Sequence, residues 1–322
     1  MRARSMTVIA LLLACFAAPA AHAQQSYPTR PVTLTHGFAA GGNGDVISRI
    51  VGDALGKRLG QPVVVEPRPG AGGNIASQRL ATSPPDGYTL ITLTSAHSVS
   101  PGIYKSLPFD PVESFQFISM VGFQALLVAV RADSPIKTMA DLIAAAKANP
   151  GKLTYSSTGV GSTQHLAGEL LCAMAGIQMT HVPYRGGGGP MTDLLGGQID
   201  VNIDTITVIE PQARAGKVIA LGVTSGKPWW SLPDITPVSA TVPGYDVRTW
   251  AGVAAPKGLP ADILKKLNAD MLAGLADSET KEKLNKIGLD IQPSTPDGMK
   301  ALVAEQVVKW KKVVADAQIP QQ

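Results

Sequence analysis

Two glycine-rich turns contain the residues with the clearest potential for chemistry. The first, FAAGGNGD, spans residues 38–45, and the second, SSTGVGST, spans residues 156–163. Each follows an apolar, strand-like run and precedes a helix-like run. Glycines in such a turn let a ligand approach the backbone, and the free amides of the following helix attract negative charge. Both turns therefore predict an anion site, which could receive a nucleotide phosphate, a catalytic oxyanion or a carboxylate.

Sequence motifs argue against the first two of these anions. The chain has no G-x-x-x-x-G-K-[ST] motif, and the third glycine of a dinucleotide fingerprint beginning at Gly42 would fall at Ile47. No serine lies in G-x-S-x-G, the nucleophile elbow of α/β-hydrolases. A carboxylate is therefore the favoured ligand, and we expect no catalytic residue and no cofactor. An enzyme whose residues meet only in three dimensions stays open as an alternative.

Metal binding is not expected, because none of the four histidines after residue 23 has a ligand-type spacing; they are His36, His97, His165 and His181. Asp204 ends the apolar run VNID, where α/β sheets bring ligand groups to a cleft. Its carboxylate could accept a hydrogen bond from a ligand amine or hydroxyl, or it could be a turn residue. The sequence leaves both interpretations open.

Several other conspicuous residues have structural explanations. Asp45 is expected to lie in the first turn of a helix, where a carboxylate is favourable. Arg185, in a third glycine-rich turn, is interpreted as a solvated charge. Cys172 lies in an apolar helical setting and is expected to be a buried, unreactive thiol. Trp310 falls on the apolar stripe of a helix starting at Pro296 and is expected in the core.

The N-terminal segment has the pattern of a secretory signal. Residues 1–23 begin with two arginines, continue with a short apolar core and end in the small-x-small pattern Ala21-His22-Ala23. A lipoprotein anchored at Cys15 is a less favoured alternative. Removal of these 23 of the 322 residues leaves 299, and loss of both arginines lowers the formal charge from +4 to +2. This small charge gives no indication of nucleic-acid binding, and export indicates the periplasm.

Strand-like and helix-like runs alternate along the chain, which predicts an α/β protein with largely parallel sheets. One βαβαβ series begins at PVTLTH, and a second begins at QALLVAVRA. They predict two similar lobes, each with its own sheet. The run TWAGVAAP and two following helices are expected to return to the first lobe.

These segments resemble the Bug-type, or tripartite tricarboxylate transporter, periplasmic solute-binding proteins. The resemblance extends from Tyr27 to nearly the end of the chain. It is carried by YPTRPVTL, FAAGGNGD, LGQPVVVEPRPGAGGNIA, PPDGYTL, PGKLTYSSTGVGSTQHLAGEL, HVPYRGGGGPMTDLLGGQID, AGKVIALGVTS, LPDITP and APKGLP. Each fragment is weak alone, but their order and spacing make the resemblance strong.

The resemblance implies a two-lobed type II periplasmic-binding-protein fold with a ligand cleft between the lobes. Lobe 1 would comprise residues 24–125 plus 248–322, and lobe 2 residues 126–247. The chain would cross between them near 123–127 and 248–252. The implied ligand-binding residues of lobe 1 are Phe38, Ala39, Gly41, Gly42 and Asn43, together with Ser95 and His97 of a loop formed by Ser95-Ala96-His97. Those of lobe 2 are Ser157, Gly161, Ser162, Thr163 and Asp204.

The implied function is capture of a small organic acid by closure of the lobes, and delivery to the membrane subunits of a tripartite tricarboxylate transporter. The protein would act as a monomer without a metal. Two alternatives remain open at this point. The liganded protein could dock on a sensor kinase instead, or it could be a periplasmic enzyme acting on organic acids.

Overall fold

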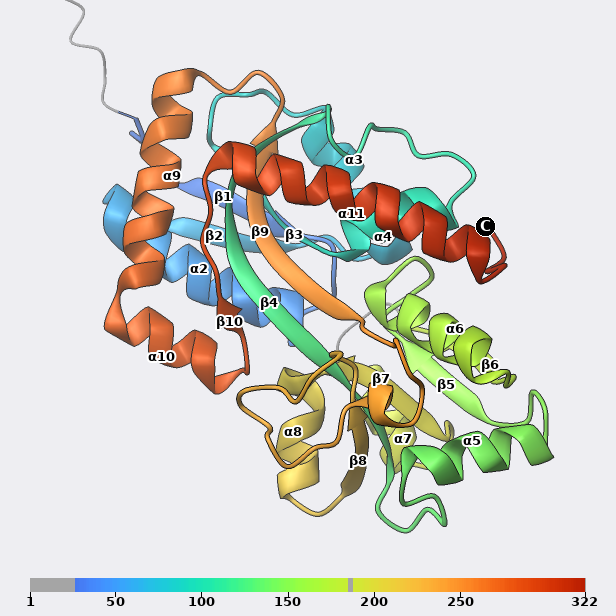
Figure 1. Ribbon diagram of the computed structural model, residues 1–322. Coiled ribbons are helices and arrows are strands. Elements are labelled where there is room, and N and C mark those ends of the chain that lie inside the picture. Colours follow the sequence, from blue (N-terminus) through green and yellow to red (C-terminus); the bar gives the residue numbers. More distant parts are fainter. Residues whose placement is uncertain (1–26, 185–187, 322) are drawn as a thin grey trace, which may run out of the picture.

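The computed structural model describes residues 27–184 and 188–321 of the chain (Figure 1). The predicted signal segment 1–23, with Cys15, and Arg185 lie outside the described residues. Strands and helices alternate through most of the chain, which confirms the predicted α/β class. Among the described helices, none combines the length and apolar character needed to span a bilayer.

The strands are β1 (Val32–His36), β2 (Val63–Pro67), β3 (Thr89–Thr94), β4 (Phe115–Arg131), β5 (Thr154–Ser157), β6 (Thr180–Pro183), β7 (Val201–Thr205), β8 (Val218–Val223), β9 (Arg248–Pro256) and β10 (Asp290–Ile291). The helices are α2 (Asn43–Leu59), α3 (Asn74–Ala81), α4 (Ala96–Ile103), α5 (Met139–Ala148), α6 (Thr163–Ala175), α7 (Gly189–Leu195), α8 (Ile206–Arg214), α9 (Ala261–Ala276), α10 (Ser278–Lys286) and α11 (Pro296–Asp316), with 3-10 turns η2 (Ala71–Gly73) and η3 (Val238–Ala240).

The strands form two sheets that share β4. The first sheet has the order β2-β1-β3-β9-β4, and the short β10 also pairs with β4. The second sheet has the order β4-β7-β5-β6, and β8 also pairs with β4. β4 is 17 residues long and pairs with β9 over Phe115–Ala125 and with β7 over Leu126–Val130. In Figure 1 it runs from the first sheet, at upper left, into the second sheet, at lower right.

The prediction of largely parallel sheets is wrong around the shared strand. Parallel pairing holds for β1 with β2 and β3, and for β5 with β6 and β7. β4 and β9 instead pair antiparallel with each other and with their other neighbours. The physical reason is that these two strands pass between the halves in opposite directions, so neither belongs to a βαβ crossover.

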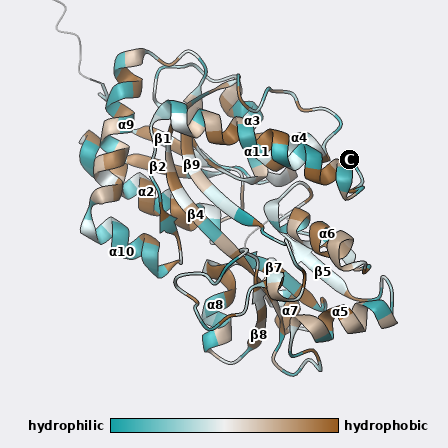
Figure 2. Ribbon diagram, in the orientation of Figure 1, coloured by the Kyte–Doolittle hydropathy of each residue, from teal (hydrophilic) through white to brown (hydrophobic). Residues whose placement is uncertain are grey.

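Apolar residues cover both faces of each sheet. In the first sheet, α2, α9 and α10 pack on one face and α3 and α11 on the other. In the second sheet, α7 and α8 cover one face, while α5 and α6 cover the other and share a core with α4 and the end of α11. Figure 2 shows the sheet strands largely hydrophobic and the helices divided between hydrophobic and hydrophilic residues. Trp310 is only 2% exposed in this core, which confirms the prediction of a buried tryptophan.

Three local predictions differ from the structure. The segment Ser95-Ala96-His97 is not a loop, because Ser95 precedes α4 and His97 lies within that helix. Three helices rather than two follow β9, because Asp277 ends α9 and caps α10 by accepting from the Thr280 amide. The predicted strand from residue 124 is the second half of the longer β4.

Candidate ligand-binding site

A pocket lies where loops of both sheets meet. Its walls come from Phe38, Gly42, Asn43, Gly44, Thr94, Thr158, Thr163, Gln164, Asp204, Thr205, Val208 and Thr249. The pocket has about 450 Å³ of empty space, including its opening to solvent, but the centre of a water molecule can reach only about 30 Å³ of it. This narrow reachable space means that the opposing walls of the pocket stand close together.

The first glycine-rich turn contributes the beginning of α2. Its N-cap residue Gly42 has no side chain to bond the amides of the first turn. In the part of the chain that the structure describes, no protein group accepts from the amides of Asn43 and Gly44, which line the pocket. The start of α2 can therefore present free donors and the positive end of the helix dipole to a ligand.

Asp45 stabilises this turn through its side-chain hydrogen bonds. Its carboxylate accepts from the Gly41 amide at 3.0 Å and from Arg49 Nε at 3.0 Å, and lies 3.2 Å from His36 Nε2. Burial raises the pKa of Asp45, but the hydrogen bonds from Arg49 and Gly41 outweigh burial and lower it overall. The Gly41 amide is therefore occupied, and neither Gly41 nor Ala39 lines the pocket.

The second turn contributes the beginning of α6. Thr163 and Gln164, in its first turn, line the pocket together with Thr158. Thr158 Oγ1 donates to Gln164 Oε1 at 3.1 Å, which leaves Gln164 Nε2 to donate to Asp204 Oδ1 at 3.1 Å. This chain of hydrogen bonds fixes the amide of Gln164 and connects the turn to β7.

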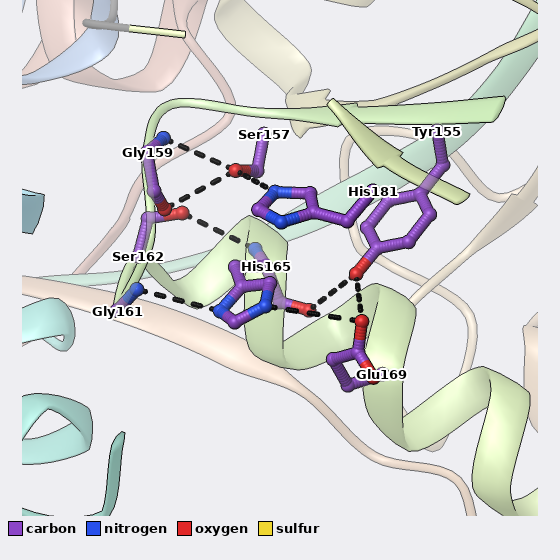
Figure 3. Close-up of polar contacts among 8 residues, drawn as sticks. All are labelled: Tyr155, Ser157, Gly159, Gly161, Ser162, His165, Glu169 and His181. Atoms are coloured by element: carbon purple, nitrogen blue, oxygen red, sulfur yellow. Dashed lines mark hydrogen bonds and ion pairs between the residues drawn. The ribbon is translucent and has the colours of Figure 1, made fainter. Parts of the chain in front are cut away.

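Three predicted residues of the second turn support it rather than line the pocket (Figure 3). Ser157 Oγ lies 2.7 Å from His181 Nε2 and accepts from the Gly159 amide at 3.1 Å. The Gly161 amide donates to His165 Nδ1 at 3.4 Å. Ser162 caps α6 by accepting from the amide of residue 165 at 3.2 Å.

The two histidines of this support form one cluster, in which His165 is buried and His181 is half-buried. Their rings stack with centroids 4.2 Å apart, and Tyr155 stacks on His181 while its hydroxyl donates to Glu169 at 2.5 Å (Figure 3). Burial lowers the pKa of His165 to about 4. The pKa of His181 is lowered to about 3 by burial and, to a smaller extent, by the neighbouring His165. Both rings are therefore neutral near pH 7, and hydrogen bonds rather than charge hold the turn.

Asp204 lies in the pocket wall at the end of β7. Its side chain is 2% exposed and accepts from Gln164 and from the Thr205 amide, at 2.7 Å. Burial raises the pKa of Asp204 to about 6, although these hydrogen bonds lower it in part. The pocket therefore contains one carboxyl group that changes charge at mildly acidic pH.

A third helix begins at the same place. α8 starts directly after Thr205, and its N-cap side chain makes no capping hydrogen bond. Thr205 and Val208 both line the pocket. Sequence reasoning did not identify this helix start. The available signal was the polar pair Asp204-Thr205 at the end of an apolar run, the residue types that usually precede a helix.

Ser95 and His97 occupy different positions from those expected. Ser95 is fully buried behind the pocket, where its hydroxyl lies 2.6 Å from Thr163 Oγ1 and donates to Thr249 Oγ1 at 2.8 Å. His97 lines a smaller neighbouring cavity, with Nε2 2.7 Å from the carbonyl oxygen of Pro111. Burial lowers the pKa of His97 to about 4.

Hydrogen bonds also join the two halves around the pocket. Thr207 Oγ1 donates to Asn43 Oδ1 at 2.7 Å, and Tyr104 donates to the carbonyl oxygen of Val160 at 3.1 Å. Gly72 lies so near the second turn that an added Cβ would come within 2.9 Å of the Val160 oxygen. The loops of the two sheets are thus in direct contact on both sides of the pocket.

The lining combines neutral hydrogen-bonding groups with one acidic side chain, Asp204. None of the pocket-lining residues is a lysine, arginine or histidine. Within residues 27–184 and 188–321, no group of three or more His, Cys, Asp or Glu side chains is arranged to hold a metal ion. Cys172 is buried, and burial raises its pKa to about 11, so it is held as the thiol.

Comparison with known proteins gives the family. Residues 47–319 match the sequence profile described as the tripartite tricarboxylate transporter family receptor. The chain belongs to this family. The chain is also similar to a protein of Pseudomonas sp. strain P51, the "UPF0065 protein in tcbD-tcbE intergenic region", which is 34% identical over 293 residues, covering 90% of this chain and 87% of that relative.

Solved structures of similar proteins agree with this assignment. R. palustris Rpa4515, solved with adipate, is 34% identical and has a TM-score of 0.88, covering 92% of this chain and 100% of the other. MatC of Rhodopseudomonas palustris, solved with bound malate, is 30% identical and has a TM-score of 0.85, covering 89% of this chain and 100% of the other. These likenesses confirm the predicted family and the periplasmic-binding-protein fold.

Proposed function

We propose that this protein is a periplasmic receptor that binds a small organic acid in the pocket described above. The observation that carries the proposal is the convergence of three helix beginnings, those of α2, α6 and α8, on one pocket without lysine or arginine. Each helix start favours negative charge by roughly 0.3–1 kcal/mol, and by more when partly buried. Several backbone amides and threonine hydroxyls could thus hold a carboxylate without a cationic side chain.

Relatives support the chemical class of the ligand. Rpa4515 was solved with adipate and MatC with malate, and both are small dicarboxylates. For this chain we propose the same class, with delivery to the membrane subunits of a tripartite tricarboxylate transporter and removal of residues 1–23 during export. Residues 24–125 plus 248–322 would form lobe 1, and residues 126–247 lobe 2.

Closure of the lobes would complete the site. Phe38 and Gly42 lie in the turn between β1 and α2, and Asn43 and Gly44 begin α2, on the side of the first sheet. Thr163 begins α6 and Asp204 lies in β7, on the side of the second sheet. A ligand that contacts both groups binds the closed form better than the open form, and this difference in affinity is what drives closure. The crossing strands β4 and β9 would serve as the hinge.

A thermal-shift panel tests the proposal. The exported protein is heated alone and with succinate, malate, glutarate, adipate, hexanoate or glucose. A ligand at about 100 times its Kd adds about 2.7 kcal/mol to the free energy of unfolding, which corresponds to a rise of about 4 °C in Tm for a chain of this size. We expect at least one organic acid, and not glucose, to give this rise. Stabilisation by the sugar alone would contradict the proposal, and recovery of the acid unchanged would argue against an enzyme.

The pH dependence of binding distinguishes between ligand types. A ligand carboxylate close to Asp204 disfavours its ionised form, so binding takes up a proton and becomes tighter as the pH falls through about 6. A ligand ammonium bonded to Asp204 has the opposite effect and binds more tightly above that pH. Titration calorimetry at pH 5 and pH 7.5 separates plain organic acids from amino acids.

A further inference from the structure

Three hydroxyl groups meet at the wall of the ligand pocket. Ser95 Oγ lies 2.6 Å from Thr163 Oγ1 and 2.8 Å from Thr249 Oγ1. Thr163 and Thr249 line the pocket, whereas Ser95 does not. All three residues are buried, since Ser95 is 0% exposed, Thr163 2% and Thr249 7%. Bulk water therefore does not compete for these hydrogen bonds, and the three residues form one connected hydroxyl chain.

The direction of donation along this hydroxyl chain follows from the number of protons. Each hydroxyl has one proton to donate and lone pairs with which to accept. Ser95 donates its proton to Thr249 Oγ1, so the 2.6 Å contact requires Thr163 to donate to Ser95. The proton of Thr249 then has no acceptor among the described residues. Because a buried donor without an acceptor is costly, the Thr249 hydroxyl is left to donate into the pocket that this residue lines.

The surroundings of Ser95 fix the centre of the hydroxyl chain. Ser95 stands at the N-cap of α4, a position where serine usually accepts from the helix amides, yet its hydroxyl makes no capping hydrogen bond. Its own amide donates to the carbonyl oxygen of Trp250 at 3.1 Å, which ties it to β9 next to Thr249. The Ser95 hydroxyl thus serves the pocket wall rather than its own helix.

The hydroxyl chain also joins the two halves of the protein. Ser95 precedes α4 and Thr249 lies in β9, both in the first sheet or beside it, whereas Thr163 begins α6 on the side of the second sheet. The hydrogen bond between Thr163 and Ser95 therefore links the two sides of the pocket. A ligand that contacts both threonines is held by groups that one serine aligns.

We propose that Ser95 is a positioning residue for ligand binding, which accepts from Thr163 and donates to Thr249 and so directs the Thr249 hydroxyl to donate to an oxygen of the bound organic acid. This inference rests on the proposed function, because it assumes that an acid occupies the pocket. It replaces the role expected for Ser95, that of a ligand contact, with one exerted through two neighbours. The ligand atom facing Thr249 has to accept a hydrogen bond, as a carboxylate oxygen does and an ammonium group does not.

A double-mutant cycle tests whether Ser95 acts through Thr249. Titration calorimetry measures the Kd of succinate, malate, glutarate and adipate for the wild type, Ser95→Ala, Thr249→Val and the double variant. Thr249→Val removes a hydrogen bond to a charged group, so the Kd of at least one acid should rise about tenfold or more. Ser95→Ala should raise the same Kd about 2- to 12-fold, as the loss of a neutral hydrogen bond predicts. The double variant should bind about twofold or more tightly than the product of the two single effects predicts, because the residues act together.

Two controls match these substitutions. Ser98→Ala, in α4, removes a fully buried hydroxyl that has no partner among the described residues and does not line the pocket. Thr180→Val removes an exposed hydroxyl that donates to the carbonyl oxygen of Gly151, away from the pocket. Both controls should bind each acid with the wild-type Kd.

The possible results separate the proposal from a structural role and from the proposed function. A Kd for Ser95→Ala or Thr249→Val that equals or falls below the wild-type value would overturn the proposal, and a lowered Tm with unchanged Kd would assign Ser95 a purely structural role. Single effects that multiply in the double variant would also overturn it. Failure of every acid to bind the wild type would instead overturn the proposed function. If Ser95→Ala fails to fold, Thr163→Val takes its place in the cycle, because it removes the donor to Ser95, and the same results decide.

Discussion

The hydrogen bond between Thr207 and Asn43 offers a direct test of lobe closure. Thr207 Oγ1 donates to Asn43 Oδ1 at 2.7 Å, joining α8 of one half to α2 of the other. Thr207 does not line the pocket, so Thr207→Val removes a contact between the halves without removing a ligand contact. Gln124 Nε2, which also donates to this hydroxyl at 3.0 Å, retains the carbonyl oxygen of Ile287 as a second partner.

The size of the effect follows from the strength of one neutral hydrogen bond. Such a bond stabilises the closed form by about 0.5–1.5 kcal/mol, and both residues are half-buried, so water can partly replace it. The apparent Kd rises in proportion to the lost population of the closed form. We therefore expect Thr207→Val to weaken binding of an organic acid about 2- to 12-fold.

Titration calorimetry with the acid that stabilises the wild type most measures this change. Thr180→Val serves again as the control, and its Kd should equal that of the wild type. A Kd for Thr207→Val that equals or falls below the wild-type value would refute the reasoning. It would mean that the halves do not separate when the ligand leaves, so that their contacts carry no binding energy.

Three further predictions concern stability. Asp204→Asn should remove a pH dependence of stability, because burial raises the pKa of Asp204 from 3.8 to about 6 in the folded protein. As the pH rises from about 4 to above 6, the free energy of unfolding of the unliganded wild type should fall by up to about 3 kcal/mol relative to the variant. Urea unfolding measures this difference. His181→Gln should have the opposite effect, because the pKa of His181 is lowered to about 3 in the folded protein. The free energy of unfolding of the wild type should fall relative to that of this variant as the pH drops below about 6.5. Plots of unfolding free energy against pH that run parallel for the two proteins would contradict this prediction. Trp310→Ala should cost about 3–5 kcal/mol in urea unfolding because the side chain is 2% exposed, whereas Val308→Ala on the same helix, at a residue 70% exposed, should change the free energy of unfolding by less than about 0.5 kcal/mol.

Sequence reasoning found the two glycine-rich turns because their composition contrasts with the apolar runs around them. It missed the start of α8 because the residues after Asp204, Thr205-Ile206-Thr207-Val208, are all β-branched, and such residues favour strands over helices. Tertiary packing decides that helix, since Ile206 and Ile209 are both fully buried.

The sequence also could not specify which side chain of a turn lines the pocket. Ser157 ends β5 and Thr158 follows it, and neighbouring residues of an extended chain point to opposite sides. Ser157 thereby meets His181, while Thr158 lines the pocket. The register that decides between them depends on pairing with β6 and β7, which no local pattern specifies.

The position of β9 in the first sheet has a consequence for how the chain folds. β9 lies between β3 and β4, although residues 132–247 separate it from β4 along the chain. Until residues 248–256 arrive, β3 and β4 each carry an unpaired edge, and such edges attract other strands. The central strand of the first sheet is thus supplied late, by a segment that follows the whole second sheet. A chain that stops before Arg248 would lack the middle of its first sheet rather than an end, so an incomplete chain would expose two unpaired strand edges until residues 248–256 are available.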